Sequence, residues 1–224
     1  KEAGCRRVIL ALGGSCTDDG GVGAASALGA VFTRADGEAF IPVGGTLGEI
    51  AAVNCSPVKK ALEGLELTIM CDIDNPLFGE TGAAYVFAPQ KGADASMVER
   101  LDNGLRHLAK VTSQCLGRDF SQLPGAGAAG GLGFGMAAYC GGKLRMGIDV
   151  VLDTAGFDGL LQTADLVFTG EGKIDSQSIR GKVVSGVAER GKKAGVPVIA
   201  VVGQIGPGFE PMYEKKKTEE DMGF

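Results

Sequence analysis

Residues 12–21 read Leu12-Gly13-Gly14-Ser15-Cys16-Thr17-Asp18-Asp19-Gly20-Gly21. They follow an apolar run at 7–12, which is typical of a buried strand, and they precede an amphipathic pattern at 20–28, which is typical of a helix. In open α/β sheets, ligands bind beyond the carboxyl ends of the strands. The segment is therefore expected to be a glycine-rich turn at a strand end where a ligand can bind.

Two more expected strands end in carboxylates. The run at 66–71 is followed by Asp72-Ile73-Asp74-Asn75-Pro76, and the run at 165–169 by Gly170-Glu171-Gly172-Lys173-Ile174-Asp175. Carboxylates bind Mg²⁺ or act as general bases, and glycine amides bind phosphate oxygens. Taken singly, each carboxylate is equally well explained as a turn or N-cap residue. Three such strand ends together favour a site.

Strand and helix patterns alternate along the chain, which predicts an α/β fold with a largely parallel or mixed sheet. The expected strands are residues 7–12, 66–71, 83–88, 148–152, 165–169 and 197–202. The expected helices are residues 20–28, 56–63, 94–115, 130–140, 157–162 and 178–194.

The composition is that of a globular protein with an unusual number of glycines. There are 38 glycines in 224 residues, and 45% of the residues are hydrophobic. The net charge of −5 argues against a nucleic-acid or anionic-membrane partner. No apolar run approaches the roughly 20 residues of a membrane span. A small-molecule substrate is the partner we expect.

Histidine and cysteine narrow the possible chemistry. His107 is the single histidine and lies on the flank of an amphipathic helix, so we expect it to be packed or solvated, not catalytic. The six cysteines form no CxxC pair, which indicates reduced thiols and a cytoplasmic location. Cys16 differs from the other five cysteines because it lies in the glycine-rich turn. It is explained as well as a small side chain that fills space there.

Residues 125–135, Gly-Ala-Gly-Ala-Ala-Gly-Gly-Leu-Gly-Phe-Gly, contain the pattern GxGxxG, but no strand precedes them. A dinucleotide fingerprint needs that strand. Two interpretations of this segment remain open: a turn that binds an anion, and tight helix packing through small residues. The Gly-Lys pairs are never followed by Ser or Thr, so no Walker A loop is present.

Lysines beside glycines, such as Lys91 and Lys182, suit a phosphate or carboxylate ligand, although an exposed lysine is commonly just solvated. The residues alone therefore predict an α/β enzyme that uses Mg²⁺ and acts on a phosphorylated or carboxylated small molecule.

Four blocks of the sequence resemble the glycerate kinase family, whose bacterial members phosphorylate D-glycerate with ATP. Residues 12–21 resemble a family motif usually written GGSATNDGG. The other blocks are residues 71–77 with 87–93, residues 125–135, and residues 169–178 with Gly181-Lys182. They occur in the expected order along nearly the whole chain.

The resemblance implies a two-domain α/β protein with its active site in the cleft between a Rossmann-like domain and an inserted α/β domain. Residues 1–190 would form the inserted domain, and residues 191–224 would be a partial return to the Rossmann-like domain. The family's N-terminal segment and C-terminal end would lie outside this sequence, so we expect a fragment of a longer protein.

The implied reaction is phosphorylation of D-glycerate with ATP and Mg²⁺, giving 2-phosphoglycerate in preference to 3-phosphoglycerate. The implied catalytic residues are Asp175 as base and Asp19 as its partner, with exchangeable roles. Substrate or phosphate would be bound by Gly13, Gly14, Ser15, Lys91, Gly125, Gly127, Gly130 and Lys182. Metal would be bound by Glu171, Asp72 and Asp74.

Two departures from the family motif bear on activity. Cys16 replaces an alanine, and Asp18 replaces an asparagine, which adds a negative charge beside Asp19. Two alternatives remain open: a catalytically incomplete fragment that binds ligand or only folds, and a kinase for a related sugar acid or a Mg²⁺-dependent phosphatase. The sequence leaves the oligomeric state open.

Overall fold

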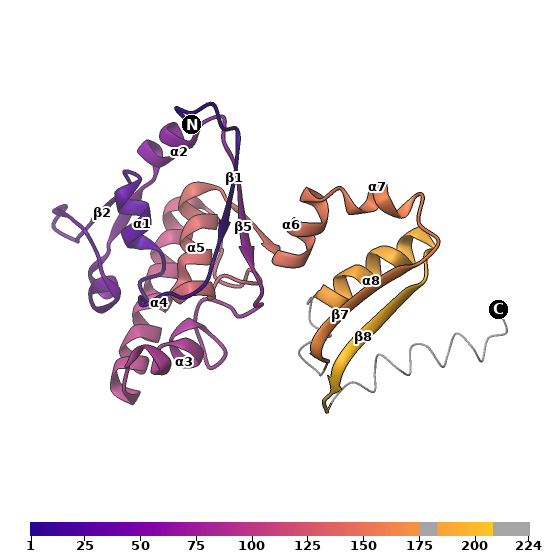
Figure 1. Ribbon diagram of the computed structural model, residues 1–224. Coiled ribbons are helices and arrows are strands. Elements are labelled where there is room, and N and C mark those ends of the chain that lie inside the picture. Colours follow the sequence, from indigo (N-terminus) through magenta and orange to yellow (C-terminus); the bar gives the residue numbers. More distant parts are fainter. Residues whose placement is uncertain (175–182, 208–224) are drawn as a thin grey trace. The chain divides into compact units, whose positions relative to one another are not determined.

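The computed structural model describes residues 1–174 and 183–207, which fall into two compact units (Figure 1). The first unit is Lys1–Arg145 and the second is Met146–Phe224. The boundary between the two units thus lies after Arg145. The assignment of residues 1–190 and 191–224 to two domains of the family remains a prediction.

The main sheet of the first unit has the strand order β1-β5-β6. Its strands are β1 (Arg7–Ala11), β5 (Glu66–Cys71) and β6 (Lys143–Met146). Strands β1 and β5 are parallel, with Arg7 opposite Glu66 and Ala11 opposite Met70. Because their carboxyl ends meet at one edge, the loops that follow them start side by side.

A small antiparallel sheet covers another part of this unit, in the order β3-β2-β4. It consists of β2 (Val31–Thr33), β3 (Ala39–Phe40) and β4 (Ala52–Asn54). These strands have two or three residues each, too few for a period-two pattern to show, so the sequence analysis missed them.

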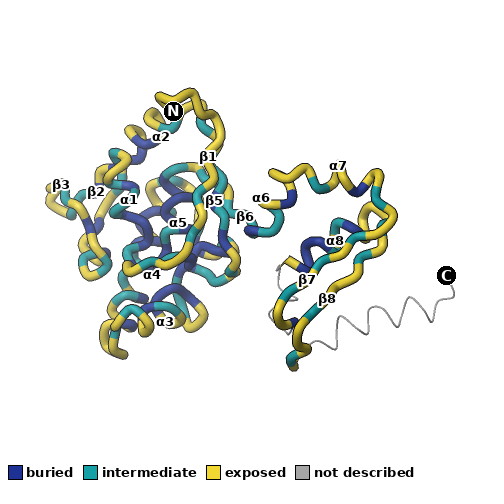
Figure 2. The backbone as a smooth tube through the Cα atoms, viewed as in Figure 1, coloured by how far each residue is buried: buried dark blue, intermediate teal, exposed yellow. Residues whose placement is uncertain are grey.

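Helices of the first unit bury most of its core. They are α1 (Val22–Ala27), η1 (Gly44–Glu49), α2 (Ser56–Leu62), α3 (Ala83–Phe87), η2 (Pro89–Lys91), α4 (Ala95–Leu116) and α5 (Ala128–Cys140). Helix α4 begins where the Asp94 carboxylate accepts the N–H of Met97 at 2.9 Å, and it ends at Gly117, which has φ 71°. Figure 2 shows buried residues concentrated along α5.

Tyr139 of α5 lies at the centre of this core. Its ring packs edge-to-face against Phe32 and Phe134, at centroid distances of 5.5 and 5.9 Å. Its hydroxyl is hydrogen-bonded to the Thr112 hydroxyl of α4 at 2.8 Å, which satisfies both buried groups. Burial raises the pKa of Tyr139 far above its ordinary value. One side chain thereby joins α4, α5 and the small sheet.

The second unit contains α6 (Gly147–Thr154), α7 (Phe157–Leu161), β7 (Val167–Ile174), α8 (Val183–Ala194) and β8 (Val198–Ile205). Strands β7 and β8 are parallel, with Val167 opposite Val198. Arg190 of α8 donates to Asp149, Asp153 and Asp158 at 3.2, 2.7 and 2.7 Å, which ties three helices together.

Two strand predictions are wrong. Residues 83–88 and 148–152 lie in the helices α3 and α6, because a short apolar run suits a buried helix as well as a strand. A third prediction needs correction: residues 170–174 do not follow a strand but belong to β7. No helix within residues 1–174 and 183–207 is long and apolar enough to cross a membrane.

Candidate active site

The loop between β1 and α1 is fixed by the carboxylate of Asp19. Its Oδ1 accepts the N–H of Gly21 at 2.9 Å, and its Oδ2 accepts the N–H of Gly23 at 3.1 Å. Both carboxylate oxygens therefore accept backbone N–H groups at the start of α1, which would otherwise lack partners. Asp19 holds the loop in place as well as lining the pocket described below.

The glycine-rich turn at residues 125–131, which overlaps the non-helical first residues of α5, packs directly on this loop. The carbonyl of Gly130 accepts the N–H of Gly20 at 3.0 Å. A Cβ atom on Gly130 would collide with the carbonyl oxygen of Thr17, and one on Gly131 would lie 2.7 Å from the Cα of Gly20. Only glycine allows such a close backbone approach at positive φ.

The same turn also contacts the loop after β5. Gly127 donates its N–H to the carbonyl of Asn75 at 2.9 Å, and a Cβ on Gly125 would lie 2.5 Å from the Sγ of Cys71. Gly125, Gly127 and Gly130 are all buried. These contacts favour the packing interpretation of residues 125–135, and their phosphate-binding role remains a prediction.

Lys91 contacts the loop between β1 and α1 from a distant part of the sequence. It ends η2 (Pro89–Lys91), which follows the helix α3 and not the strand expected there. Its Nζ donates to the carbonyl of Thr17 at 2.6 Å and lies 3.2 Å from Oδ2 of Asp18. The side chains of Lys91 and Asp18 are 10% and 4% exposed, so this is a largely buried ion pair.

Asp18 has one carboxylate oxygen, Oδ1, that is not paired with Lys91. Its Oδ1 is buried and has no hydrogen-bond partner among the described residues. Burial raises the pKa of Asp18 above its ordinary value, while Lys91 acts in the opposite direction. A buried carboxylate oxygen without a donor is costly, so a ligand that supplies a donor would bind favourably here.

These groups line a pocket of about 320 Å³, a volume that suits a small molecule. Two acids, Asp18 and Asp19, and two bases, Lys91 and Arg100, line it. The remaining lining residues are Cys16, Thr17, Val43, Gly44, Ala88, Gly92, Ala93, Met97 and Leu101. The pocket can therefore take a ligand that has both an anionic group and hydrogen-bond donors.

The other predicted site residues are placed as follows. Gly13, Gly14 and Ser15 follow β1, and nothing lies within 4 Å of a Cβ built on either glycine. Asp72 and Asp74 are exposed in the loop after β5. Glu171 is in β7 of the second unit, where its Oε1 is buried without a hydrogen-bond partner among the described residues. Asp175 and Lys182 lie outside the described residues.

Comparison with known proteins identifies the family. The model of the glycerate kinase family matches residues 1–219. The chain belongs to the glycerate kinase family. It is 46% identical to a glycerate kinase of Bacillus cereus over 96% of this chain and 56% of that protein. It is 42% identical to the glycerate 2-kinase of Escherichia coli over 91% of this chain and 54% of that protein.

A solved structure agrees. The chain superposes with a TM-score of 0.79 on the crystal structure of a provisionally assigned glycerate kinase 2 from Salmonella typhimurium LT2. The two are 41% identical, and the match covers 92% of this chain and 57% of that one. The chain thus spans about half the length of the glycerate kinases that it matches.

Membership of a kinase family implies a nucleotide, and Mg²⁺ would bind together with it. No cluster of three His, Cys, Asp or Glu side chains suited to a metal occurs within residues 1–174 and 183–207. Among the described residues, however, one carboxylate oxygen of Asp18 is buried without a hydrogen-bond partner, and so is one of Glu171 in the second unit. Mg²⁺ commonly binds through one or two carboxylates and the substrate's phosphates. Each of these carboxylates, taken by itself, therefore fits a metal that arrives with a nucleotide.

Sequence reasoning missed Arg100 as a site residue and noted Asp18 only as a departure from the family motif. Arg100 comes from the exposed side of α4, and no motif surrounds it. Asp18 did carry a signal, the added charge beside Asp19. Its pairing with Lys91, 73 residues away in sequence, is a tertiary contact that no local pattern encodes.

Thiol reactivity offers a first test of the pocket at Asp18. Cys5, Cys16 and Cys115 are exposed, whereas burial raises the pKa of Cys55, Cys71 and Cys140, the last to about 11. We expect three fast and three slow thiols with DTNB, because the thiolate is the reactive form. A small hydroxy acid that binds in this pocket should slow the alkylation of Cys16 alone, measured by mass spectrometry. Equal protection of Cys5 would contradict this placement.

Proposed function

We propose that this chain carries part of the active site of an ATP-dependent D-glycerate kinase that forms 2-phosphoglycerate. The observation that supports this most is the buried Oδ1 of Asp18, which has no hydrogen-bond partner in residues 1–174 and 183–207 and lies in a pocket with Lys91 and Arg100. Glycerate has a carboxylate and two hydroxyl groups, which match the bases and the free acceptor of the pocket.

The pocket suggests how the substrate binds. The guanidinium of Arg100 is exposed at the pocket, where its fork can pair with the carboxylate of glycerate. A substrate hydroxyl can donate to Oδ1 of Asp18. Lys91 is already bonded to Thr17 and Asp18, so it balances the charge of Asp18 and positions the loop.

The chemical step is an in-line transfer. The 2-hydroxyl oxygen of glycerate attacks the γ-phosphorus of ATP, the bond between that phosphorus and the β,γ-bridging oxygen breaks, and ADP leaves. The hydroxyl proton goes to an aspartate, for which we propose Asp175 as the base and Asp19 as its partner. The amides of Gly13 and Gly14, the hydroxyl of Ser15 and the amino group of Lys182 would stabilise the phosphoryl charge.

Bound Mg²⁺ would neutralise charge on the transferred phosphoryl group, and we propose Glu171, Asp72 and Asp74 as its protein ligands. We also propose that the protein works in the cytoplasm, which the six free cysteines support.

The test is a coupled ADP-release assay with D-glycerate, ATP and Mg²⁺. It is run on the 224-residue chain and on the full-length protein. Activity in the full-length protein, with 2-phosphoglycerate identified by NMR, is the expected result. Turnover of another sugar acid in place of glycerate would favour that alternative substrate class. A folded full-length protein without turnover would contradict the proposal.

Two substitutions in the full-length protein should separate binding from chemistry. Arg100→Gln should raise KM for glycerate about tenfold and leave kcat nearly unchanged, because a hydrogen bond between charged groups contributes about 1.5 kcal/mol. Asp175→Asn should lower kcat at least about 100-fold, the usual contribution of a general base. The control is Lys110→Gln, an exposed lysine on the same helix as Arg100. Near-normal kcat in Asp175→Asn would exclude Asp175 as the base.

A further inference from the structure

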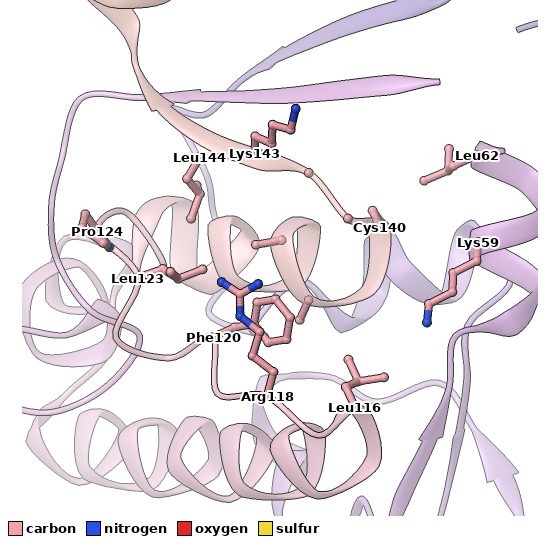
Figure 3. Close-up of a pocket in the computed structure, with 14 residues that line it drawn as sticks. Lys59, Leu62, Leu116, Arg118, Phe120, Leu123, Pro124, Cys140, Lys143 and Leu144 are labelled. Atoms are coloured by element: carbon pink, nitrogen blue, oxygen red, sulfur yellow. The ribbon is translucent and has the colours of Figure 1, made fainter. Parts of the chain in front are cut away.

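A second, larger pocket lies elsewhere in the first unit (Figure 3). Its volume is about 720 Å³, within the usual range for small-molecule sites. It forms where α2, the ends of α4 and α5, and β6 come together. Its lining includes the basic residues Lys59, Arg118 and Lys143 and the apolar residues Leu116, Leu123 and Leu144. None of them lines the candidate active site.

Much of this lining is apolar and only partly covered. Leu62, Leu116, Phe120 and Leu123 pack against the hydrophobic core from outside and are half-buried. Leu144 adds a further half-buried side chain. Apolar surface that stays in contact with water is available to an apolar ligand, which gains about 25 cal/mol for each Å² that it covers.

The charged groups of this lining all have one sign. Lys59, Arg118 and Lys143 are basic, and within the described residues no Asp or Glu side chain lines this pocket. The chain as a whole carries a net charge of −5, so the pocket differs from the rest of the surface. A region of one sign with low-dielectric walls attracts ligands of the opposite sign.

Arg118 is placed to bind an acidic group. Its guanidinium lies 4.9 Å from the centroid of the Phe120 ring, a contact that holds it in place. Figure 3 shows Arg118 beside Phe120, among the leucines, while the amino group of Lys143 points away from them. Lys143 instead contacts Glu66 at 3.5 Å. Arg118 and Lys59 are thus the bases that a ligand in this pocket would meet.

We propose that this pocket binds an amphipathic organic anion, a carboxylate with an apolar chain or ring. The carboxylate would bind at Arg118, with Lys59 adding positive charge elsewhere in the lining, and the apolar body would lie on Leu116, Leu123 and Leu144. Glycerate lacks an apolar body, so this ligand belongs to a class other than the proposed substrate. The inference does not depend on the proposed function.

Calorimetric titration with octanoate tests the proposal on the 224-residue chain. Octanoate should bind more tightly than hexanoate, by roughly tenfold, since each buried CH₂ contributes about 0.8 kcal/mol. Octylammonium, which has the same chain and the opposite charge, should not bind. Equal binding of octanoate and octylammonium would mean non-specific apolar contact and would overturn the proposal.

Matched variants locate the site. Arg118→Gln should weaken octanoate binding about tenfold, because a hydrogen bond to a charged group is lost. Lys110→Gln, on the exposed side of α4 and outside the pocket, should leave it unchanged. Equal effects of the two substitutions would overturn the proposal. So would loss of octanoate binding in the full-length protein, because the rest of that protein would then cover the pocket.

Discussion

Gly130→Ala should lower the free energy of unfolding by about 3 kcal/mol or more, from two separate causes. Gly130 has φ 69°, and an L side chain in that left-handed region costs about 1–2 kcal/mol. The new methyl group would also collide with the carbonyl oxygen of Thr17, in a loop that cannot move freely because Lys91 and Asp19 hold it. Overpacking of this kind typically costs another 1–3 kcal/mol, roughly.

The matched control is Gly141→Ala. Gly141 ends the same helix, α5, with nearly the same φ of 70°, but nothing lies within 4 Å of a Cβ built there. This variant should lose only the backbone component, about 1 kcal/mol. Urea unfolding followed by circular dichroism measures both. Equal losses in the two variants would show that the contact with Thr17 contributes nothing.

The strands and long helices of this fold could be predicted wherever the pattern is local. Residues 66–71 form β5 as expected, and α4 buries Val98, Leu105 and Leu108, which belong to its predicted apolar stripe. His107 is half-buried and its Nε2 lies 2.7 Å from the carbonyl oxygen of Ile50, which confirms that it is packed on the flank. The strand predicted at residues 83–88 was wrong because a run of five or six apolar residues is too short to show whether its period is that of a strand or of a helix.

The candidate site shows a different limit. Asp19 could be singled out because it lies in one motif at a strand end, whereas Asp18 was noted only as a departure from that motif, and the roles of Gly13 and Gly14 stay predictions. The sequence left the interpretation of residues 125–135 open, and the contacts of Gly130 with the loop at Thr17 favour packing. A glycine-rich segment has the same sequence whether its backbone faces a ligand or another loop, so only the fold separates the two.

Lys91→Met should lower the free energy of unfolding by about 3–5 kcal/mol near neutral pH, because it leaves the buried carboxylate of Asp18 unpaired. The carbonyl of Thr17 loses its donor as well. Lys143→Met is the control: Lys143 and Glu66 form an exposed pair at 3.5 Å, which contributes less than about 1 kcal/mol. Comparable losses in the two variants would contradict the buried pair.

The pH dependence of the free energy of unfolding of Lys91→Met provides a second, independent test of the ion pair between Lys91 and Asp18. The pKa of Asp18 is raised by burial above its ordinary 3.8, so the folded protein holds that proton more firmly than the unfolded chain. Stability from this group therefore falls as the pH rises above 3.8, and without Lys91 the fall should be steeper and extend to higher pH.

Adding Asp18→Asn to Lys91→Met should remove this slope and recover most of the lost stability, because a neutral amide costs less to bury than a charge. A double variant as unstable as Lys91→Met alone, with the same slope, would show that Asp18 is not the group that Lys91 neutralises.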